Sequence, residues 1–379
     1  MNNCWTALTR LGYCALWIAM TMPTTMAEVT QTPLYVSGQD GYNTYRIPAV
    51  AVTKAGTVLA FCEGRKSGQG DAGNIDMLLK RSSDNGRTWS EQQIIWDDEG
   101  NTCGNPAPVV DQQTGTIFLL MTWNRGDDPE RDIIAGTSKD TRRVFVTQSE
   151  DDGLTWSAPW EITASTKSPN WTWYATGPGA GIQLRKGKYK GRLVIPCDNM
   201  EADTGYKYAH AIYSDDHGAT WQLGKRTPNR YVNECEVVEL DTGELMLNMR
   251  NYDHSQRTRQ VAISHDGGET WTQQAHDPTL IEPTCQASIR RAGKFRGKHK
   301  RDLLFSNPAH ETKRLNMTVR LSRDNGQTWP QSLVLFKSHS AYSDLAMLKN
   351  GQVACLYEHG DQNPYQTITF ATMELEDID

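Results

Sequence analysis

Short runs of strand-forming hydrophobic residues recur along the chain, separated by polar turns. Five of these runs lead into the same eight-residue pattern, S-x-D-x-G-x-T-W. The copies lie at residues 82–89, 149–156, 214–221, 264–271 and 322–329. So strict a recurrence, at intervals of about 50 to 65 residues, indicates that one supersecondary unit is repeated along the chain.

Each copy of the pattern predicts a β-hairpin. The Asp side chain can bond to the backbone of the turn, and the Gly accepts the positive φ that such turns need. Thr and Trp then begin the next strand, and the Trp is large enough to pack back onto its own hairpin. Because helical periodicity is scarce throughout, the sequence predicts an all-β chain with room for loops on one face.

The amino-acid composition argues against membranes and nucleic acids as binding partners. The 379 residues include 31 Gly and 12 Trp, which fits many tight turns and many indoles. A mean hydropathy of -0.62 argues against a membrane-embedded body. The net charge of -6 disfavours nucleic acid and anionic membranes as partners. An anionic substrate would therefore need a local cluster of arginines. The sequence leaves the oligomeric state open.

Residues 1–27 have the features of a signal peptide. Arg10 supplies a positive charge, residues 11–22 are mostly apolar, and Thr25 and Ala27 flank a small-residue cleavage site. A short uncleaved anchor is the alternative interpretation. We expect a leader at 1–27, a mature domain at 28–379, and export to the periplasm or the medium with no membrane insertion of the mature chain.

The cysteines do not suggest a metal site. Two of the eight, Cys4 and Cys14, fall in the predicted leader, and no pair has C-x-x-C spacing. Cys62 and Cys197 lie in apolar runs and are expected to be buried as small hydrophobic residues. The repeated D-x-G lacks the acidic series and terminal Glu of a calcium loop. We therefore expect no metal and no other cofactor.

The repeated pattern is similar to the Asp box of sialidases and related β-propellers. This resemblance implies one six-bladed β-propeller over residues 28–379, with four antiparallel strands per blade. In that family the Asp box lies at a hairpin turn away from the active site, so the repeats themselves imply structure rather than chemistry.

Two further segments resemble the start of the sialidase catalytic domain. Residues 45–48 read Y-R-I-P, where the family has the first arginine of a triad that holds the sugar carboxylate, here Arg46. A structural salt bridge is the alternative for an arginine in so apolar a setting. Residues 58–65 read VLAFCEGR, which implies Arg65 at the pocket rim. The glycine-rich loop that follows presents Asp71 where the family has its acid/base; Asp76 is the rival.

A predicted hairpin at residues 233–250 resembles the family segment that carries a glutamate and the second triad arginine. Glu234 and Arg250 occupy those positions. Glu236 and Glu239 compete on composition, and strand alternation places Glu236 on the same face as Glu234. Only the family match selects Glu234.

The last two matches complete the set. Arg314 precedes a T-V-R-L strand and is the expected third arginine, with Arg320 as the alternative. Residues 340–345 read S-A-Y-S-D-L, where the family has its nucleophilic tyrosine, here Tyr342. The matches thus predict Asp71, Glu234 and Tyr342 as catalytic residues, and Arg46, Arg65, Arg250 and Arg314 as substrate-binding residues.

This resemblance implies an exo-α-sialidase that removes terminal sialic acid from glycans. A neutral phenol can approach an anomeric carbon that already bears a carboxylate, and sialidases are the tyrosine exception among glycosidases. A trans-sialidase, or a hydrolase of a related nonulosonic acid, would carry the same motifs. Aromatic residues at 123–128 and 171–174, expected in loops, could stack on an acceptor sugar. A non-catalytic lectin would lack Tyr342, Glu234 or Asp71.

Overall fold

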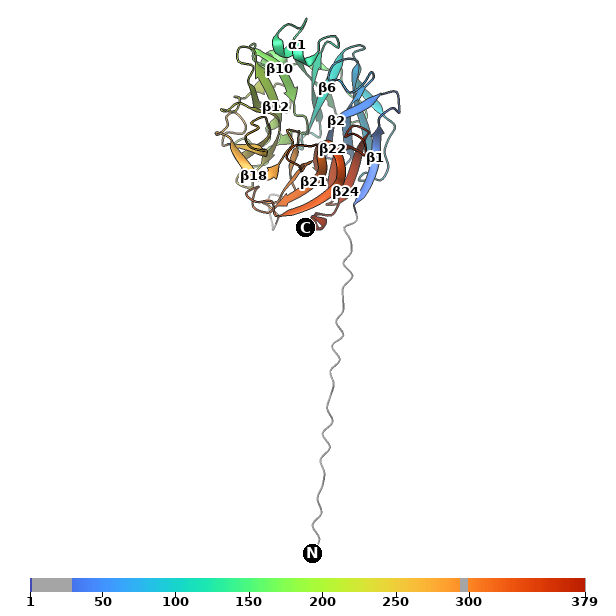
Figure 1. The fold of residues 1–379 in the computed structure, drawn as a ribbon, viewed down its shortest axis with the longest axis vertical. Helices are drawn as coiled ribbons and strands as arrows, with labels where there is room; N and C mark the ends of the chain where they lie inside the picture. The colour runs from blue at the N-terminus through green and yellow to red at the C-terminus, as the bar shows by residue number, and fades with distance from the viewer. Residues whose placement is uncertain (2–28, 294–298, 379) are drawn as a thin grey trace.

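The computed structural model describes residue 1, residues 29–293 and residues 299–378 (Figure 1). The predicted leader at 1–27 lies outside the described residues apart from Met1, so it stays a prediction. Within the described ranges, no helix combines the length and the hydrophobicity needed to cross a bilayer.

Strands account for nearly all of the regular structure, which confirms the all-β prediction. In chain order they are β1 (Thr30–Val36), β2 (Thr44–Val52), β3 (Val58–Arg65), β4 (Ile75–Ser82), β5 (Gln93–Trp96), β6 (Thr102–Val110), β7 (Ile117–Asn124), β8 (Arg143–Ser149), β9 (Trp160–Glu161), β10 (Trp171–Thr176), β11 (Ile182–Gln183), β12 (Leu193–Glu201), β13 (Lys207–Ser214), β14 (Gln222–Leu223), β15 (Val232–Glu239), β16 (Leu245–Asn251), β17 (Thr258–Ser264), β18 (Ala275–Ile281), β19 (Ser288–Arg291), β20 (Leu303–Pro308), β21 (Leu315–Ser322), β22 (Gln331–Met347), β23 (Val353–Gly360) and β24 (Thr367–Met373). The short helices are α1 (Glu130–Ala135), α2 (Thr163–Thr166) and the 3-10 turn η1 (Leu375–Asp377).

The strands form antiparallel sheets in which chain neighbours pair. Their orders are β2-β3-β4-β6-β7-β8-β9 with β5 on β4, β10-β12-β13-β14 with β11 on β12, β15-β16-β17-β18, and β1-β24-β23-β22-β21-β20-β19. A single parallel bridge, Ile75 to Thr102, joins β4 to β6. The long strand β22 pairs with β21 through its first half and with β23 through its second half.

Strands from the successive sheets contact one another in turn around a closed circuit (Figure 1). Strand β2 contacts β6, β6 contacts β10 and β12, β12 contacts β15, β15 contacts β19, β19 contacts β22, and β22 returns to β2. The first strand, β1, pairs with the last, β24, so the two ends of the described fold lie in one sheet.

The repeated pattern forms the turns predicted for it. In the first copy, Asp84 accepts bonds from the Thr88 backbone N–H at 2.9 Å and from the Thr88 hydroxyl at 2.6 Å. The Ser82 hydroxyl accepts the Gly86 N–H at 2.8 Å. The other four copies repeat these bonds within about 0.1 Å.

The indoles of the first three copies pack differently from the prediction. Trp89, Trp156 and Trp221 lie edge-on against Phe370, Phe61 and Phe118, at centroid distances of 5.0, 5.8 and 6.1 Å. Phe370 lies on β24, Phe61 on β3 and Phe118 on β7, outside the strands that flank each of these turns, so the tryptophans do not cover only their own hairpins. Such edge-to-face pairs contribute about 0.5–1.5 kcal/mol beyond area burial.

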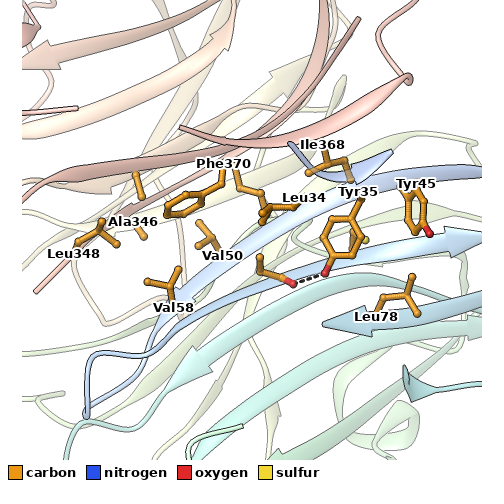
Figure 2. Close-up of a cluster of buried hydrophobic side chains, with 14 of the residues drawn as sticks. Leu34, Tyr35, Tyr45, Val50, Val58, Leu78, Ala346, Leu348, Ile368 and Phe370 are labelled. Carbon is orange, nitrogen blue, oxygen red and sulfur yellow. Dashed lines mark hydrogen bonds between the residues drawn. The ribbon is translucent and has the colours of Figure 1, made fainter. Parts of the chain in front are cut away.

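A hydrophobic cluster between β1, β2, β3 and β24 shows how the sheets meet (Figure 2). Val50, Val58 and Phe370 interdigitate there, and the buried Tyr35 hydroxyl donates to the Ala60 carbonyl at 2.8 Å. The six cysteines of the described residues are buried and unpaired, which confirms Cys62 and Cys197 as small core residues.

Candidate active site

A cavity of about 270 Å³ brings together all seven residues that the sequence proposed for the site. Strands and loops from distant parts of the chain supply them: Arg46 from β2, Arg65 from the end of β3, Asp71 from the β3–β4 loop, Glu234 from β15, Arg250 from β16, Arg314 from the loop before β21, and Tyr342 from β22. The sequence separation of these residues shows that the complete fold, rather than one segment, assembles the cavity.

β-Bulges occur where five strands meet the cavity. In each, two residues on one strand face one on its partner, between Arg46 and Ala49, Gly104 and Ala107, Trp171 and Tyr174, Val232 and Cys235, and Ser340 and Ser343. A bulge bends its strand and changes the direction of the side chains within it. Glu234 and Tyr342 lie inside two of these bulges, and Arg46 lies at the edge of a third.

Tyr342, Glu234 and Arg250 form a connected triangle. The Tyr342 hydroxyl donates to Glu234 Oε1 at 2.5 Å, and Arg250 Nη1 donates to Glu234 Oε2 at 2.5 Å and to the Tyr342 oxygen at 3.1 Å. The tyrosine is 6% exposed. Both oxygens of Glu234 are thus engaged, one by the phenol and one by the guanidinium.

Three arginines surround the phenol. The guanidinium carbons of Arg46 and Arg314 lie 5.1 and 5.6 Å from the centre of the Tyr342 ring, and Arg250 bonds to its oxygen. Burial and the nearby Glu234 raise the pKa of Tyr342 well above its ordinary value, although the three guanidinium charges act in the opposite direction. The phenol is therefore protonated in the free protein and needs a base to become a nucleophile.

Glu358 on β23 is a site residue that the sequence analysis missed. Its Oε1 accepts bonds from Arg46 Nε and the Ile47 N–H, both at 2.8 Å, and its Oε2 accepts the Tyr342 backbone N–H at 3.0 Å. The salt bridge considered for Arg46 therefore exists, and it also positions Tyr342. A lone acid in the apolar strand V-A-C-L-Y-E-H-G was the available signal.

Asp71 forms an ion pair with the guanidinium of Arg65. Arg65 Nη1 is 2.8 Å from Asp71 Oδ1, and Arg65 is itself held by Glu63 at 2.6 Å and by the carbonyls of the glycine-rich loop. The Asp71 side chain is 52% exposed. Burial alone would raise its pKa, but the charges of Arg65 and Arg46 outweigh burial and lower it.

The rival residues lie elsewhere in the fold. Asp76 is buried outside the cavity, bonded to the Tyr42 hydroxyl at 2.5 Å and to Lys66 at 3.0 Å. Glu236 lies deeper along β15 and accepts bonds from Ser288 and the Ile289 N–H. Glu239 accepts the backbone N–H groups of residues 185 and 186. Arg320 does not line the cavity.

Other residues that line the cavity were not proposed from the sequence. They are Ile47, Glu63, Asn105, Glu130, Arg142, Ala175, Asp198, Asn233, Tyr252 and Tyr365. Residues 171–174 were expected in a loop but belong to strand β10, because they pair with β12. Of the loop expected at 123–128, residues 123 and 124 belong to strand β7, which pairs with β6 and β8. Of the aromatics proposed to face an acceptor, Trp173 lines the cavity, whereas Trp123 donates to Asp98 outside it.

Within the described residues, no group of three or more His, Cys, Asp or Glu side chains is arranged to hold a metal ion. The polar side chains of the cavity are arginines, carboxyls, tyrosines, two asparagines and a tryptophan.

Comparison with known proteins gives one family. The model of the BNR repeat-like domain matches residues 56–355. The chain is similar to a sialidase of Micromonospora viridifaciens, with 37% identity over 361 residues, 90% of this chain and 54% of that protein. It is similar to a sialidase of Bacteroides fragilis, with 32% identity over 90% of this chain and 64% of that protein. The chain thus spans between half and two thirds of these two relatives.

Shorter relatives match over nearly their whole length. Mouse sialidase-3 is 30% identical over 86% of this chain and 90% of its own. Among solved structures, the Hadza microbial sialidase Hz136 superposes with a TM-score of 0.80 at 33% identity, over 90% of this chain and 68% of that chain. A leech intramolecular trans-sialidase shares the fold, with a TM-score of 0.74 at 20% identity over 94% of this chain and 71% of that chain.

Proposed function

Because the chain belongs to the sialidase family, we propose that it is an exo-α-sialidase that hydrolyses terminal sialic acid from glycoproteins, glycolipids and oligosaccharides. The observation that carries this proposal is the bond from the Tyr342 hydroxyl to Glu234, inside a cavity lined by Arg46, Arg250 and Arg314. A buried phenol paired with a carboxylate and surrounded by positive charge suits attack on an anionic sugar.

The three arginines bind the carboxylate of the sugar. Each charge-assisted bond contributes about 1.5–3 kcal/mol, and the guanidinium fork fixes the orientation of the carboxylate as well as its position. Arg46 is held in place by Glu358, and Arg314 donates to the Tyr365 hydroxyl at 2.9 Å. These anchors leave the binding geometry largely formed before the substrate arrives.

Tyr342 attacks the anomeric carbon while its proton passes to Glu234 Oε1. The bond between that carbon and the glycosidic oxygen breaks, and Asp71 donates a proton to the departing oxygen. In the second step Asp71 takes a proton from water, the water oxygen bonds to the anomeric carbon, and the phenol leaves with the proton returned by Glu234. Two displacements at one carbon retain its configuration.

Binding itself prepares Asp71 for its first role. In the empty site the charges of Arg65 and Arg46 lower the pKa of Asp71 against the effect of burial, so the carboxyl is ionised near neutral pH. A bound carboxylate cancels part of the arginine charge, and this raises the pKa of Asp71 toward the range where it can donate a proton.

The proposal includes six blades of four strands around one axis. The pairing supports it when β22 is divided at His339, where its partner changes from β21 to β23: β2-β3-β4-β5, β6-β7-β8-β9, β10-β12-β13-β14, β15-β16-β17-β18, β19-β20-β21-β22, and β22-β23-β24-β1. It also includes export, with residues 1–27 as a cleaved leader and the mature domain at 28–379. N-terminal sequencing of secreted protein tests that leader, and a first residue other than Glu28 would contradict it.

The function is tested with a fluorogenic 4-methylumbelliferyl α-sialoside. The wild type should release the fluorophore, and Tyr342→Phe should lose about 10³-fold or more in kcat. Tyr189→Phe, outside the cavity, is the matched control and should behave as wild type. A folded wild type without turnover, or near-normal turnover by Tyr342→Phe, would contradict the proposal.

A further inference from the structure

The strand that carries Tyr342 has a strand partner on only one edge where it reaches the cavity. The second half of β22 pairs with β23, with Ser343 opposite Tyr357, whereas β21 pairs with the first half as far as His339. Beyond His339, no strand of the described residues pairs with the other edge of β22. Every second residue on such an edge has a backbone N–H and a C=O that need other partners when they are buried.

Side chains from β19, and from the residues just before it, bond to this edge. Gln286 Oε1 accepts the Ser343 N–H at 3.0 Å, and Gln286 Nε2 donates to the Ser343 carbonyl at 2.9 Å. Two residues further along β22, the Ser288 hydroxyl accepts the Leu345 N–H at 3.0 Å, and Arg290 Nε donates to the Leu345 carbonyl at 3.0 Å. Alternate residues of an extended segment share one face, so residues 286, 288 and 290 together replace the missing strand.

Gln286 uses its whole amide in these contacts. It is 0% exposed, and its Nε2 also donates to the Pro178 carbonyl at 3.2 Å, in the loop between β10 and β11. An amide offers one oxygen acceptor and two N–H donors, and the three bonds of Gln286 account for all of them. An apolar side chain of the same length would leave the N–H and the C=O of Ser343 buried without these partners, which is costly.

The bond from Ser343 to Gln286 also constrains Tyr342, because each peptide group is planar. The Ser343 N–H belongs to the peptide group that follows the Tyr342 Cα, and the Tyr342 N–H belongs to the peptide group that precedes it. The first N–H is bonded to Gln286, and the second is bonded to Glu358 Oε2 at 3.0 Å. With both planes held, φ and ψ of Tyr342 are fixed, and so is the direction in which its side chain leaves the strand.

We propose that Gln286 is a positioning residue for Tyr342, which holds the peptide group after the nucleophile so that the phenol meets Glu234 and the bound sugar in a reactive geometry. This inference rests on the proposed function, since it concerns the same reaction. The Tyr342 hydroxyl lies 2.5 Å from Glu234 Oε1, and a displacement of about 1 Å can lower a rate by a factor of about 100. Substrate affinity should depend little on Gln286, because other residues hold the three cavity arginines.

The first test separates kcat from KM on the fluorogenic sialoside. Gln286→Met keeps the approximate length of the side chain and removes its amide. We expect kcat to fall about 10- to 100-fold, and KM to change by less than about threefold.

Gln183→Met on β11 is the matched control. Gln183 Oε1 accepts the Gln112 N–H at 2.7 Å. Its Nε2 donates to Asp111 Oδ1 at 2.8 Å and to the Gly191 carbonyl at 3.0 Å. This glutamine therefore bonds in the same pattern as Gln286, but it does not line the active-site cavity. Gln183→Met should lower the Tm and leave kcat within about twofold of the wild type.

A second variant keeps the test valid if Gln286→Met does not fold. Gln286→Asn retains the amide on a side chain one methylene shorter, so its bonds to Ser343 must lengthen. We expect kcat to fall about 3- to 30-fold, again with little change in KM. A kcat loss in the Gln286 variants no larger than that of Gln183→Met would overturn the proposal.

Fluorine NMR reports the placement of Tyr342 without turnover. The protein is labelled with 3-fluorotyrosine, and the Tyr342 signal is the one absent from Tyr342→Phe. This signal should shift or broaden in Gln286→Met and stay unchanged in Gln183→Met, because only the first variant releases the peptide group next to Tyr342. If the wild type does not cleave the sialoside but the signal moves in this way, the proposed function fails and the positioning role stands. A signal that Gln286→Met leaves unchanged would overturn the positioning role, even if kcat falls.

Discussion

The Tyr342 oxygen and Oε1 of Glu234 are 2.5 Å apart, at the short end of hydrogen bonds made to charged acceptors. Glu234→Gln keeps an acceptor at this place but cannot take up the phenol proton. We predict that kcat falls by about 10²–10⁴-fold while KM changes much less, because the arginines that bind the carboxylate are retained. Steady-state kinetics on the fluorogenic sialoside measures both; a change confined to KM would contradict the role of Glu234 as base.

Glu358 neutralises Arg46 and fixes the backbone of Tyr342 from one buried position. Glu358→Ala should lower the free energy of unfolding by about 3–5 kcal/mol, because it leaves Arg46 as a buried charge without its partner. Urea unfolding measures this loss. Arg131→Gln, which removes only the exposed pair with Asp132, should change stability by less than about 1 kcal/mol. Similar losses in both variants would contradict the prediction.

Ligand binding should be accompanied by proton uptake at acid pH. The pKa of Asp71 is lowered in the free protein, so the group is ionised above about pH 4. A carboxylate bound by the arginines raises this pKa, and a group whose pKa rises on binding takes up protons between its free and bound values. Calorimetry of free sialic acid near pH 4–5, in buffers of different ionisation enthalpy, measures the uptake.

The control for this measurement is Asp71→Asn, which should bind sialic acid without proton uptake. The wild type should also bind without proton uptake when the pH is well above the pKa of Asp71 in the complex. Proton release on binding, or unchanged uptake in Asp71→Asn, would show that the arginines and Asp71 are not coupled in this way.

Gly218, the turn glycine of the third repeat, allows the β13–β14 turn to approach strand β7 closely. A Cβ on Gly218 would lie 2.3 Å from the Phe118 ring, and the residue has a φ of +83°. A positive φ alone costs a residue with a Cβ about 1–2 kcal/mol. Gly218→Ala should therefore lower the free energy of unfolding by more than this amount. Gly205 has a φ of +66° and no atom within 4 Å of its Cβ position. Gly205→Ala therefore measures the cost of positive φ without a steric clash. Equal melting temperatures for the two variants would contradict the close packing.

The repeats were predictable because each one carries its own local chemistry. Ser82, Asp84 and Thr88 satisfy the turn within eight residues, so the sequence alone is enough to specify it. The seven site residues were found through motifs, and the structure places them in one cavity.

What the sequence could not indicate depends on pairing between distant strands. Glu358 is a single acid in an apolar strand, and nothing local shows that it binds Arg46. Nothing local shows either that Arg142 and Asp198 line the cavity. Residues 171–174 were misassigned to a loop because polar residues and a Gly-Pro pair surround them, and only pairing with β12 makes them a strand.

The bulges that present Glu234 and Tyr342 suggest how this protein tolerates mutation. Each is an extra residue on one strand of a ladder, so its loss would restore regular pairing and turn the following side chains to the opposite face of the sheet. Single-codon deletions within 341–342 or 233–234 should therefore be far more harmful than most substitutions there. Loops outside the bulged strands can vary in length without moving these side chains, and that gives evolution, or a protein engineer, freedom to alter the mouth of the cavity while its chemistry stays in place.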